Sequence, residues 1–210
     1  MSSSAETKTQ IGWIGLGKMG HPMALNLINT GQKVTVFNRS KGKSKAHVKA
    51  GGTLSNTIAE LADTSERIVT MISDDLAMEE IALCEDGIIN HAHEGSVLID
   101  MSTISPAISA KVARAAEDKK ISYLRSPVNG TVMQAEAGSL VILASGPKRV
   151  FNTCMPLMEI LGDRIYYIGE DERARYLKLC INAMVGITSS MMGEALALGE
   201  AGGLDWDMMI

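Results

Sequence analysis

A glycine loop near the N-terminus has the residue types and spacing to bind a diphosphate. Residues 15–20 match the pattern G-x-G-x-x-G, a weak signal alone, but here it follows an apolar run, 10–14, and opens an amphipathic one. In that setting the glycines permit a tight turn, close approach of a diphosphate to the backbone, and close packing of helix on strand. Backbone N–H groups at the helix start attract the phosphates. We therefore expect a dinucleotide-binding loop made of Gly15, Leu16, Gly17, Lys18, Met19 and Gly20.

The end of the next expected strand, 33–37, in which polar and apolar residues alternate, distinguishes between the two nicotinamide dinucleotides. A site for NAD usually has an acidic residue about 20 residues after the glycines, where it binds the ribose hydroxyls. This chain has Asn38 and Arg39 there instead. An arginine can stack on adenine and pair with a 2′-phosphate, so we expect NADP (NADPH) in preference to NAD. Further candidate cofactor residues near the ends of the second and third expected strands are Ser40, Lys43, Met71, Ile72 and Ser73.

A candidate for proton transfer is Lys178, which stands in an apolar stretch together with Asn182. Their spacing of four residues places both on one face of a helix. A lysine in such surroundings is either a surface residue that extends its ammonium group into water or a partly desolvated functional amine. The residues alone leave both interpretations open.

The elements that must position these residues alternate between strand and helix. Strands are expected at residues 10–14, 33–37, 67–72, 96–100, 121–124, 140–144 and 164–168. Helices are expected to follow the glycine loop as far as about residue 31 and to cover about 41–50, 105–119, 151–161 and 172–201. Such alternation without hairpin turns predicts the α/β class, with a doubly wound and mostly parallel Rossmann sheet.

This order of elements divides the chain into three segments. Residues 1–9 are polar and predict a disordered tail, and residues 10–169 predict an NADP-binding Rossmann domain. Residues 170–210 predict a long interdomain helix and the start of an all-α domain. Because the chain ends on an apolar run, 208–210, we expect it to be truncated, with the rest of that helical domain absent.

Composition excludes several classes of function. Hydrophobic residues make up 46% of the 210, enough for a buried core, whereas a net charge of −4 and 4% aromatics argue against nucleic-acid binding. The three cysteines, all in apolar contexts, are interpreted as reduced buried thiols, and no metal site is expected. The N-terminus has no apolar signal core, and no apolar run is long enough for a membrane span, because polar residues interrupt the nearest one, 183–198. The expected location is cytoplasmic.

At four places the chain resembles the β-hydroxyacid dehydrogenase family. This family includes 3-hydroxyisobutyrate dehydrogenase, glyoxylate and succinic semialdehyde reductases, and 6-phosphogluconate dehydrogenase. The glycine loop runs on into 21–27, similar to the family's M-A-x-N-L, and Asp100–Pro106 resembles D-x-S-T-x-x-P. Residues 126–131 resemble A-P-V-S-G-G, and 178–182 resemble K-x-x-x-N.

The resemblance implies roles for the residues at these four motifs. It places Thr103 near the nicotinamide ribose, and it makes Lys178 with Asn182 the catalytic pair. It also implies an all-helical domain after the long helix and a homo-oligomer, a dimer or tetramer. The implied substrate-binding residues are Ser102, Asn129, Gly130 and Thr131. Asn129 and Thr131 replace the family's serine and glycine, so the substrate does not follow from the pattern.

The expected function is therefore an NADP-dependent oxidoreductase. It would transfer a hydride between the nicotinamide and a small hydroxy acid or aldehyde acid, with a lysine as proton donor and acceptor. One alternative is a non-catalytic NADP-binding module that senses redox state or scaffolds partners, against which the lysine and asparagine argue. Another is an imine reductase on the same fold, but such enzymes usually lack this lysine.

Overall fold

The computed structural model describes residues 9–210, so the predicted disordered tail lies outside the described residues except for Thr9. Within these residues nine strands form one sheet in the order β3-β2-β1-β4-β5-β6-β8-β7, with β9 also paired to β8. Their bounds are β1 Gln10–Ile14, β2 Lys33–Phe37, β3 Thr53–Leu54, β4 Arg67–Thr70, β5 Val97–Asp100, β6 Ser122–Arg125, β7 Val128–Asn129, β8 Leu140–Ser145 and β9 Gly162–Gly169. Strands β1 to β6 pair in parallel, and the order reverses beside β1, as in a doubly wound Rossmann sheet. The predicted fold class is confirmed.

The far edge of the sheet is mixed. Strand β8 runs antiparallel to β6 and β7 and parallel to β9. Among residues 9–210, β6 and β8 pair in register through Arg125 and Ser145, and β7 adds two further pairs with β8. The sequence predicts a mostly parallel sheet, and the antiparallel pairs are confined to this edge.

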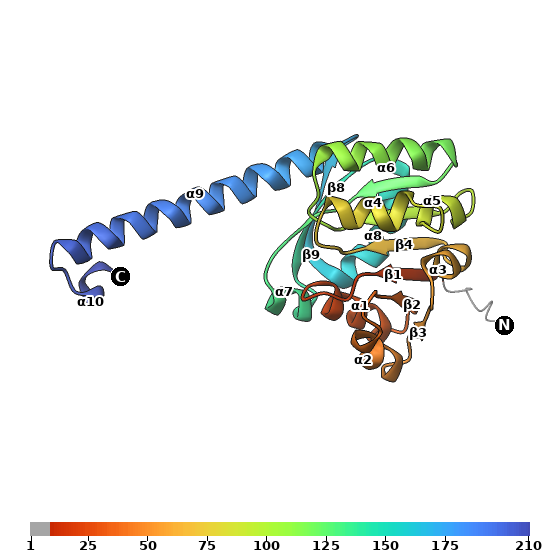
Figure 1. Cartoon of the computed structure of the whole chain (residues 1–210), viewed down its shortest axis with the longest axis horizontal. Helices are drawn as coiled ribbons and strands as arrows, with labels where there is room; N and C mark the ends of the chain where they lie inside the picture. The colour runs from red at the N-terminus through yellow and green to blue at the C-terminus, as the bar shows by residue number, and fades with distance from the viewer. Residues whose placement is uncertain (1–8) are drawn as a thin grey trace, which may run out of the picture.

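Helices cover both faces of the sheet (Figure 1). Their bounds are α1 Gly20–Asn29, α2 Lys45–Lys49, α3 Ile58–Thr64, α4 Asp75–Leu83, α5 Ile88–His91, α6 Pro106–Asp118, α7 Val132–Ala137, α8 Lys148–Leu161, α9 Arg173–Ala201 and α10 Trp206–Met209. Neighbouring strand residues serve opposite cores: Ile68 packs with α3 to α6, and Val69 packs with α1 and α8. This alternation along buried strands produces two hydrophobic cores from one run of apolar residues.

Several short elements do not follow from the sequence patterns. Strands β3 and β7 have two residues each, and α3, α4, α5 and α7 have at most nine. The predicted helix at 41–50 is a 3₁₀ turn, Lys41–Ser44, followed by the single-turn helix α2. Short helices give too few turns for an apolar period, although Thr57 and Asp74 cap α3 and α4 with their side chains.

Helix α9 extends away from the domain, and α10 folds back at its far end (Figure 1). By length and composition α9 could cross a membrane, contrary to the sequence expectation, because its Met, Val, Ile and Leu residues offset the interrupting polar ones. This is weak evidence, since core helices of soluble proteins meet the same criterion.

The three cysteines differ in burial. Cys154 is buried as expected, whereas Cys84 and Cys180 are exposed, so the expectation of buried thiols is wrong for these two.

Candidate active site

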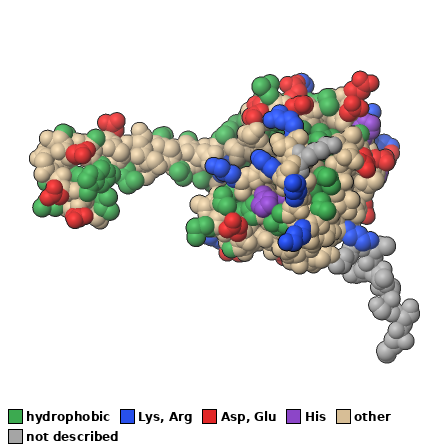
Figure 2. Space-filling view, turned by 60° about the horizontal axis from the view of Figure 1, so that its bottom comes forward, with side chains coloured by type: hydrophobic (Ala, Val, Ile, Leu, Met, Phe, Trp, Pro, Cys, Tyr) green, Lys and Arg blue, Asp and Glu red, His purple; other side chains and the backbone are tan. Residues whose placement is uncertain are grey.

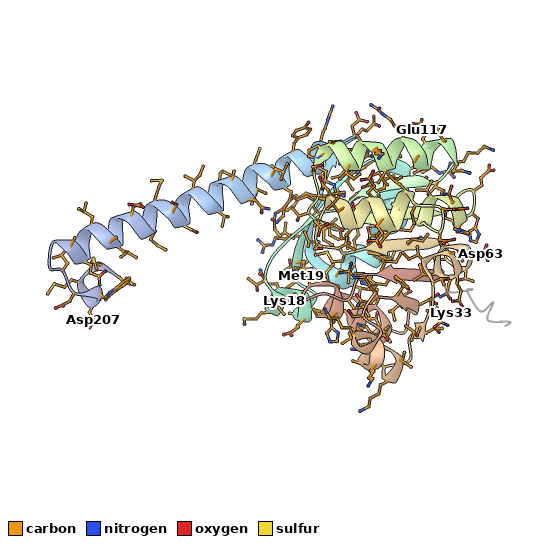
Figure 3. The ribbon with its side chains drawn as sticks, viewed as in Figure 1. Lys18, Met19, Lys33, Asp63, Glu117 and Asp207 are labelled. Atoms are coloured by element: carbon orange, nitrogen blue, oxygen red, sulfur yellow. The ribbon has the colours of Figure 1, made fainter. Side chains whose placement is uncertain are left out.

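A cavity of about 480 Å³ opens at the carboxyl ends of β1, β2 and β4. This is the edge at which open α/β sheets bind ligands. The predicted cofactor residues that line it are Gly15, Gly17, Lys18, Met19, Gly20, Asn38, Arg39, Ser40, Lys43, Met71, Ile72 and Ser73. Leu16 and Thr103 are not among its described lining residues, but the Leu16 N–H donates to Asn38 Oδ1 at 2.9 Å and so joins two of the loops. Lys18 and Met19 lie where β1 leads into α1 (Figure 3).

The three motif glycines of this loop have different surroundings. A Cβ at Gly20 would lie 2.1 Å from the Gly15 carbonyl oxygen, and one at Gly15, where φ is +102°, would lie 2.2 Å from the Met71 carbonyl oxygen. A Cβ at Gly17 would meet no atom within 4 Å. Gly15 and Gly20 are therefore needed for packing, whereas Gly17 leaves open the space in which a diphosphate approaches the backbone. These positions fit a dinucleotide.

The rim of the cavity carries positive charge from Lys18, Arg39 and Lys43, whose side chains are exposed. Figure 2 shows Lys and Arg side chains gathered around a histidine on one face of the domain. Asn38 holds the strand end in place, because its amide also donates to the Ser40 carbonyl at 3.1 Å. The arrangement suits a phosphorylated ligand.

Further lining residues were missed by sequence reasoning: Phe37, Ile58, Ala77, Glu80 and Ile81. Most come from α3 and α4, which are too short to show a clear helical period in the sequence. The signal that could have found α4 is Asp74, which accepts a hydrogen bond from the Ala77 N–H at 2.9 Å as its N-cap. The Ser73 hydroxyl, followed by the Ala77 N–H, lowers the pKa of Asp74.

The loop after β5 connects to the cavity through Ser102. This residue is fully buried, and its Oγ accepts a hydrogen bond from the Ile72 N–H at 3.0 Å. Its own N–H donates to Asp100 Oδ1 at 3.0 Å. The hydroxyl predicted to bind substrate thus holds the cavity wall in this structure, while the neighbouring Thr103 is exposed.

The structure brings Lys178 and Asn129 together. Lys178 Nζ donates to Asn129 Oδ1 at 2.5 Å, which joins α9 to β7. Lys178 is half-buried, and this burial lowers the pKa of its ammonium group. The other catalytic candidate, Asn182, lies one helical turn further along α9 and is exposed.

The other predicted acid-binding residues have backbone roles. Gly130 has φ of +144°, and a Cβ there would lie 2.7 Å from a Leu140 methyl carbon. Thr131 is the N-cap of α7, and its N–H donates to Gln134 Oε1 at 2.8 Å. Both positions shape the turn that carries Asn129.

Sequence reasoning missed a buried polar network beside this site. Arg175, 1% exposed, forms an ion pair with Asp100, and Arg125 donates from Nε to Glu172 Oε1 at 2.8 Å. Tyr123 donates its hydroxyl to Asp100 Oδ2 at 3.0 Å. Burial, with the charge of Asp100, raises the pKa of Tyr123 far above its ordinary value, so the phenol stays protonated. Within residues 9–210 no three His, Cys, Asp or Glu side chains converge as a metal site.

Comparison with known proteins agrees with this geometry. Residues 10–169 match the family model of the NAD binding domain of 6-phosphogluconate dehydrogenase. The chain is 33% identical over 201 residues to glyoxylate/succinic semialdehyde reductase 1 of Arabidopsis thaliana, which covers 96% of the chain and 70% of that relative. It is 33% identical over 204 residues to the mitochondrial 3-hydroxyisobutyrate dehydrogenase of Mus musculus, covering 97% of the chain and 61% of that relative.

Solved structures show the same fold. The 3-hydroxyisobutyrate dehydrogenase of Mycobacterium tuberculosis with L-serine superposes with a TM-score of 0.87 at 26% identity, covering 95% of this chain and 68% of that one. An imine reductase of Myxococcus stipitatus in complex with NADP⁺ has a TM-score of 0.87 at 24% identity, covering 95% and 69%, and shows the fold alone. The site binds a nicotinamide dinucleotide, and the chain belongs to the β-hydroxyacid dehydrogenase family of oxidoreductases.

Proposed function

We propose that the whole protein is an NADP-dependent reductase or dehydrogenase of a small hydroxy acid or aldehyde acid. The observation that carries this proposal is the half-buried Lys178, whose pKa is lowered by burial and whose Nζ is held by Asn129. A surface lysine that extends into water would have neither feature. The names of the relatives support the substrate class, because they include glyoxylate, succinic semialdehyde and 3-hydroxyisobutyrate.

The chain's own residues would handle the proton and the acid group. When bound, the nicotinamide supplies or accepts the hydride. In reduction, Lys178 as an ammonium group gives its proton to the developing alkoxide oxygen, and in oxidation the neutral amine removes the hydroxyl proton. Asn182, one turn away, orients the substrate hydroxyl or the lysine. The Asn129 side chain and the Gly130 N–H would hold the carboxylate, in the turn that Thr131 shapes as the N-cap of α7. Ser102, at the cavity wall, would approach the same acid group.

Preference for NADP belongs to the same proposal. The strand end carries Asn38 and Arg39 where a site for NAD usually has an acid. Arg39 lines the cavity with Lys43 close by, and both can pair with a 2′-phosphate. A homodimer or tetramer is also proposed, because α9 exposes Met184, Met191 and Met192.

The decisive experiment is Lys178→Ala in the natural full-length protein, assayed with NADPH and a panel of small aldehyde acids. Turnover should fall about 10²- to 10⁴-fold, as expected for loss of a general acid, while NADPH binding is retained. The matched control is Lys111→Ala, an exposed lysine on α6 that pairs with Glu79. Unchanged turnover in Lys178→Ala would refute the role of the lysine. Turnover of cyclic imines but of no aldehyde acid would favour an imine reductase, and binding of NADPH without turnover would favour a non-catalytic module.

A further inference from the structure

Two ion pairs, one fully buried and one largely buried, attach the first turn of α9 to the sheet. Arg175 of α9 pairs with Asp100 at the end of β5, and Glu172 at the N-cap of α9 pairs with Arg125 at the end of β6. Asp100 and Arg125 are direct partners in the register of these strands. Glu172 and Arg175 are three residues apart on the helix. Each faces a side chain of opposite charge on the sheet, and these two side chains lie on neighbouring strands.

This crossed arrangement selects one orientation of the helix. A rotation that exchanged the two contacts would place Arg175 against Arg125 and Glu172 against Asp100, and like charges at such depth repel strongly. The two pairs are also joined to each other. The guanidinium of Arg125 stacks over the Tyr123 ring at 4.7 Å from its centroid, and the Tyr123 hydroxyl bonds to Asp100.

A third contact fixes the same turn. Ser145 at the end of β8 donates its hydroxyl to the Asp171 carbonyl at 2.7 Å and accepts the Ala174 N–H at 3.1 Å. The start of α9 is thus held by three strands at once. Beyond Lys178, whose ammonium group bonds to Asn129, the helix leaves the domain (Figure 1).

Arg175 reaches further toward the cofactor cavity than the other contacts do. Besides the carboxylate of Asp100, its Nη1 donates to the backbone carbonyl of Ser102. The Ser102 hydroxyl in turn accepts the N–H of Ile72, which lines the cavity. Lys178 follows Arg175 by three residues, so the two lie on neighbouring positions of one helix face. A continuous set of contacts runs from the lysine's helix to the cavity wall.

Arg175 stays charged in this network. Burial acts to lower the pKa of its guanidinium, but the charge of Asp100 and the contact with Tyr123 outweigh it and raise the pKa above the ordinary value. An arginine suits the place because its planar group donates in several directions at once, whereas a lysine is a point charge.

We propose that Arg175 is a positioning residue that fixes Lys178 relative to the Ser102 loop and thereby aligns proton transfer with the cofactor cavity. The inference rests on the proposed role of Lys178. It predicts that Arg175 influences the reaction through the lysine and not through binding of the dinucleotide.

The test is a double-variant cycle in the natural full-length protein, with kcat, KM and NADPH affinity measured for Arg175→Gln, Lys178→Ala and the double variant. Arg175→Gln should lower kcat about 10²-fold, the typical cost of a misplaced catalytic group, with NADPH affinity unchanged. The kcat of Arg175→Lys should lie between that of Arg175→Gln and that of the wild type. The double variant should be no slower than Lys178→Ala alone, because residues that act as a unit are non-additive.

Controls separate positioning from folding. Arg173→Gln removes an exposed arginine from the same turn and should leave kcat unchanged. Arg175→Gln should still fold, because Asp100 keeps the hydroxyls of Thr70 and Tyr123 and the N–H of Ser102 as donors. Two results would overturn the positioning role of Arg175 and leave the role of Lys178 intact, provided that Lys178→Ala has lost turnover. One is a wild-type kcat in Arg175→Gln, and the other is an additive loss of kcat in the double variant. Wild-type turnover in Lys178→Ala would overturn the proposed function together with this inference.

Discussion

Asn129 Oδ1 accepts a hydrogen bond from Lys178 Nζ at 2.5 Å across 49 residues of sequence. In the family pattern, the position of Asn129 carries a serine. The amide oxygen has no proton to give, so it can bind the lysine only as an acceptor, and it stabilises the ammonium form. This bond therefore opposes the effect of burial, which lowers the pKa of Lys178.

Changes at Asn129 should move the pH dependence of reduction in opposite directions. Reduction needs the ammonium form, so its kcat falls as pH rises through the pKa of Lys178. Asn129→Leu removes the acceptor, lowers that pKa further and should move the fall to lower pH. Asn129→Asp supplies a negative charge, raises the pKa and should move the fall to higher pH. Steady-state kcat across a pH series checks this, and a shift of both variants in one direction would contradict it.

Arg39→Ala should discriminate between the two dinucleotides. A charge-assisted bond to a 2′-phosphate contributes about 2 kcal/mol, so affinity for NADPH should fall roughly 30-fold while that for NADH changes little. Titration of cofactor fluorescence measures both constants. Lys45→Ala, an exposed lysine on α2, is the control and should change neither. Equal losses for both cofactors would rule out the assignment of Arg39.

Two glycines of one loop should respond differently to the same substitution. Gly20→Ala would press a methyl group against the Gly15 carbonyl oxygen and should destabilise the fold by about 1–3 kcal/mol. Gly17→Ala meets no atom within 4 Å, so the melting temperature should hold while dinucleotide affinity falls. Thermal unfolding without ligand and NADPH titration separate the two effects. A stable Gly20→Ala variant would show that the loop can relax.

Stability should decline in mild acid because of His47. This side chain is fully buried and bonds through Nε2 to the His21 carbonyl at 3.1 Å; burial lowers its pKa below the ordinary 6.5. The unfolded state then takes up a proton more readily than the folded state, so the free energy of unfolding falls as pH drops through 6.5. Urea unfolding at neutral and mildly acidic pH should show a smaller decline in His47→Gln. If the free energy of unfolding declines equally in His47→Gln and the wild type, groups other than His47 cause the decline.

Much of the fold and of the cofactor site could be predicted from the sequence, because both depend on local patterns. The strands β1 and β5 have apolar centres and β2 alternates between polar and apolar residues, and the glycine loop directly follows β1. Short helices such as α4 carry no such pattern, so Ala77 and Glu80 in the cavity wall went unseen.

The contacts around Lys178 could not be predicted, because they join residues far apart in sequence. Arg175 with Asp100 and Lys178 with Asn129 depend on where α9 meets the sheet, which no local period encodes. The charged stretch before Lys178 has its partners on β5, β6 and β8, three strands that lie far from it in the sequence. Ser102 illustrates the same limit, since its type suggests a ligand contact while its burial gives it a structural bond.

The attachment of α9 has a geometric consequence. A helix of 29 residues is roughly 44 Å long, so a tilt of one degree at its buried first turn displaces its far end by about 0.8 Å. A few hydrogen bonds at the start of the helix therefore determine where the atoms at its far end lie. The side chains of Glu172 and Arg175 set the direction in which the whole helix points, and with it the place of anything that packs against its exposed length.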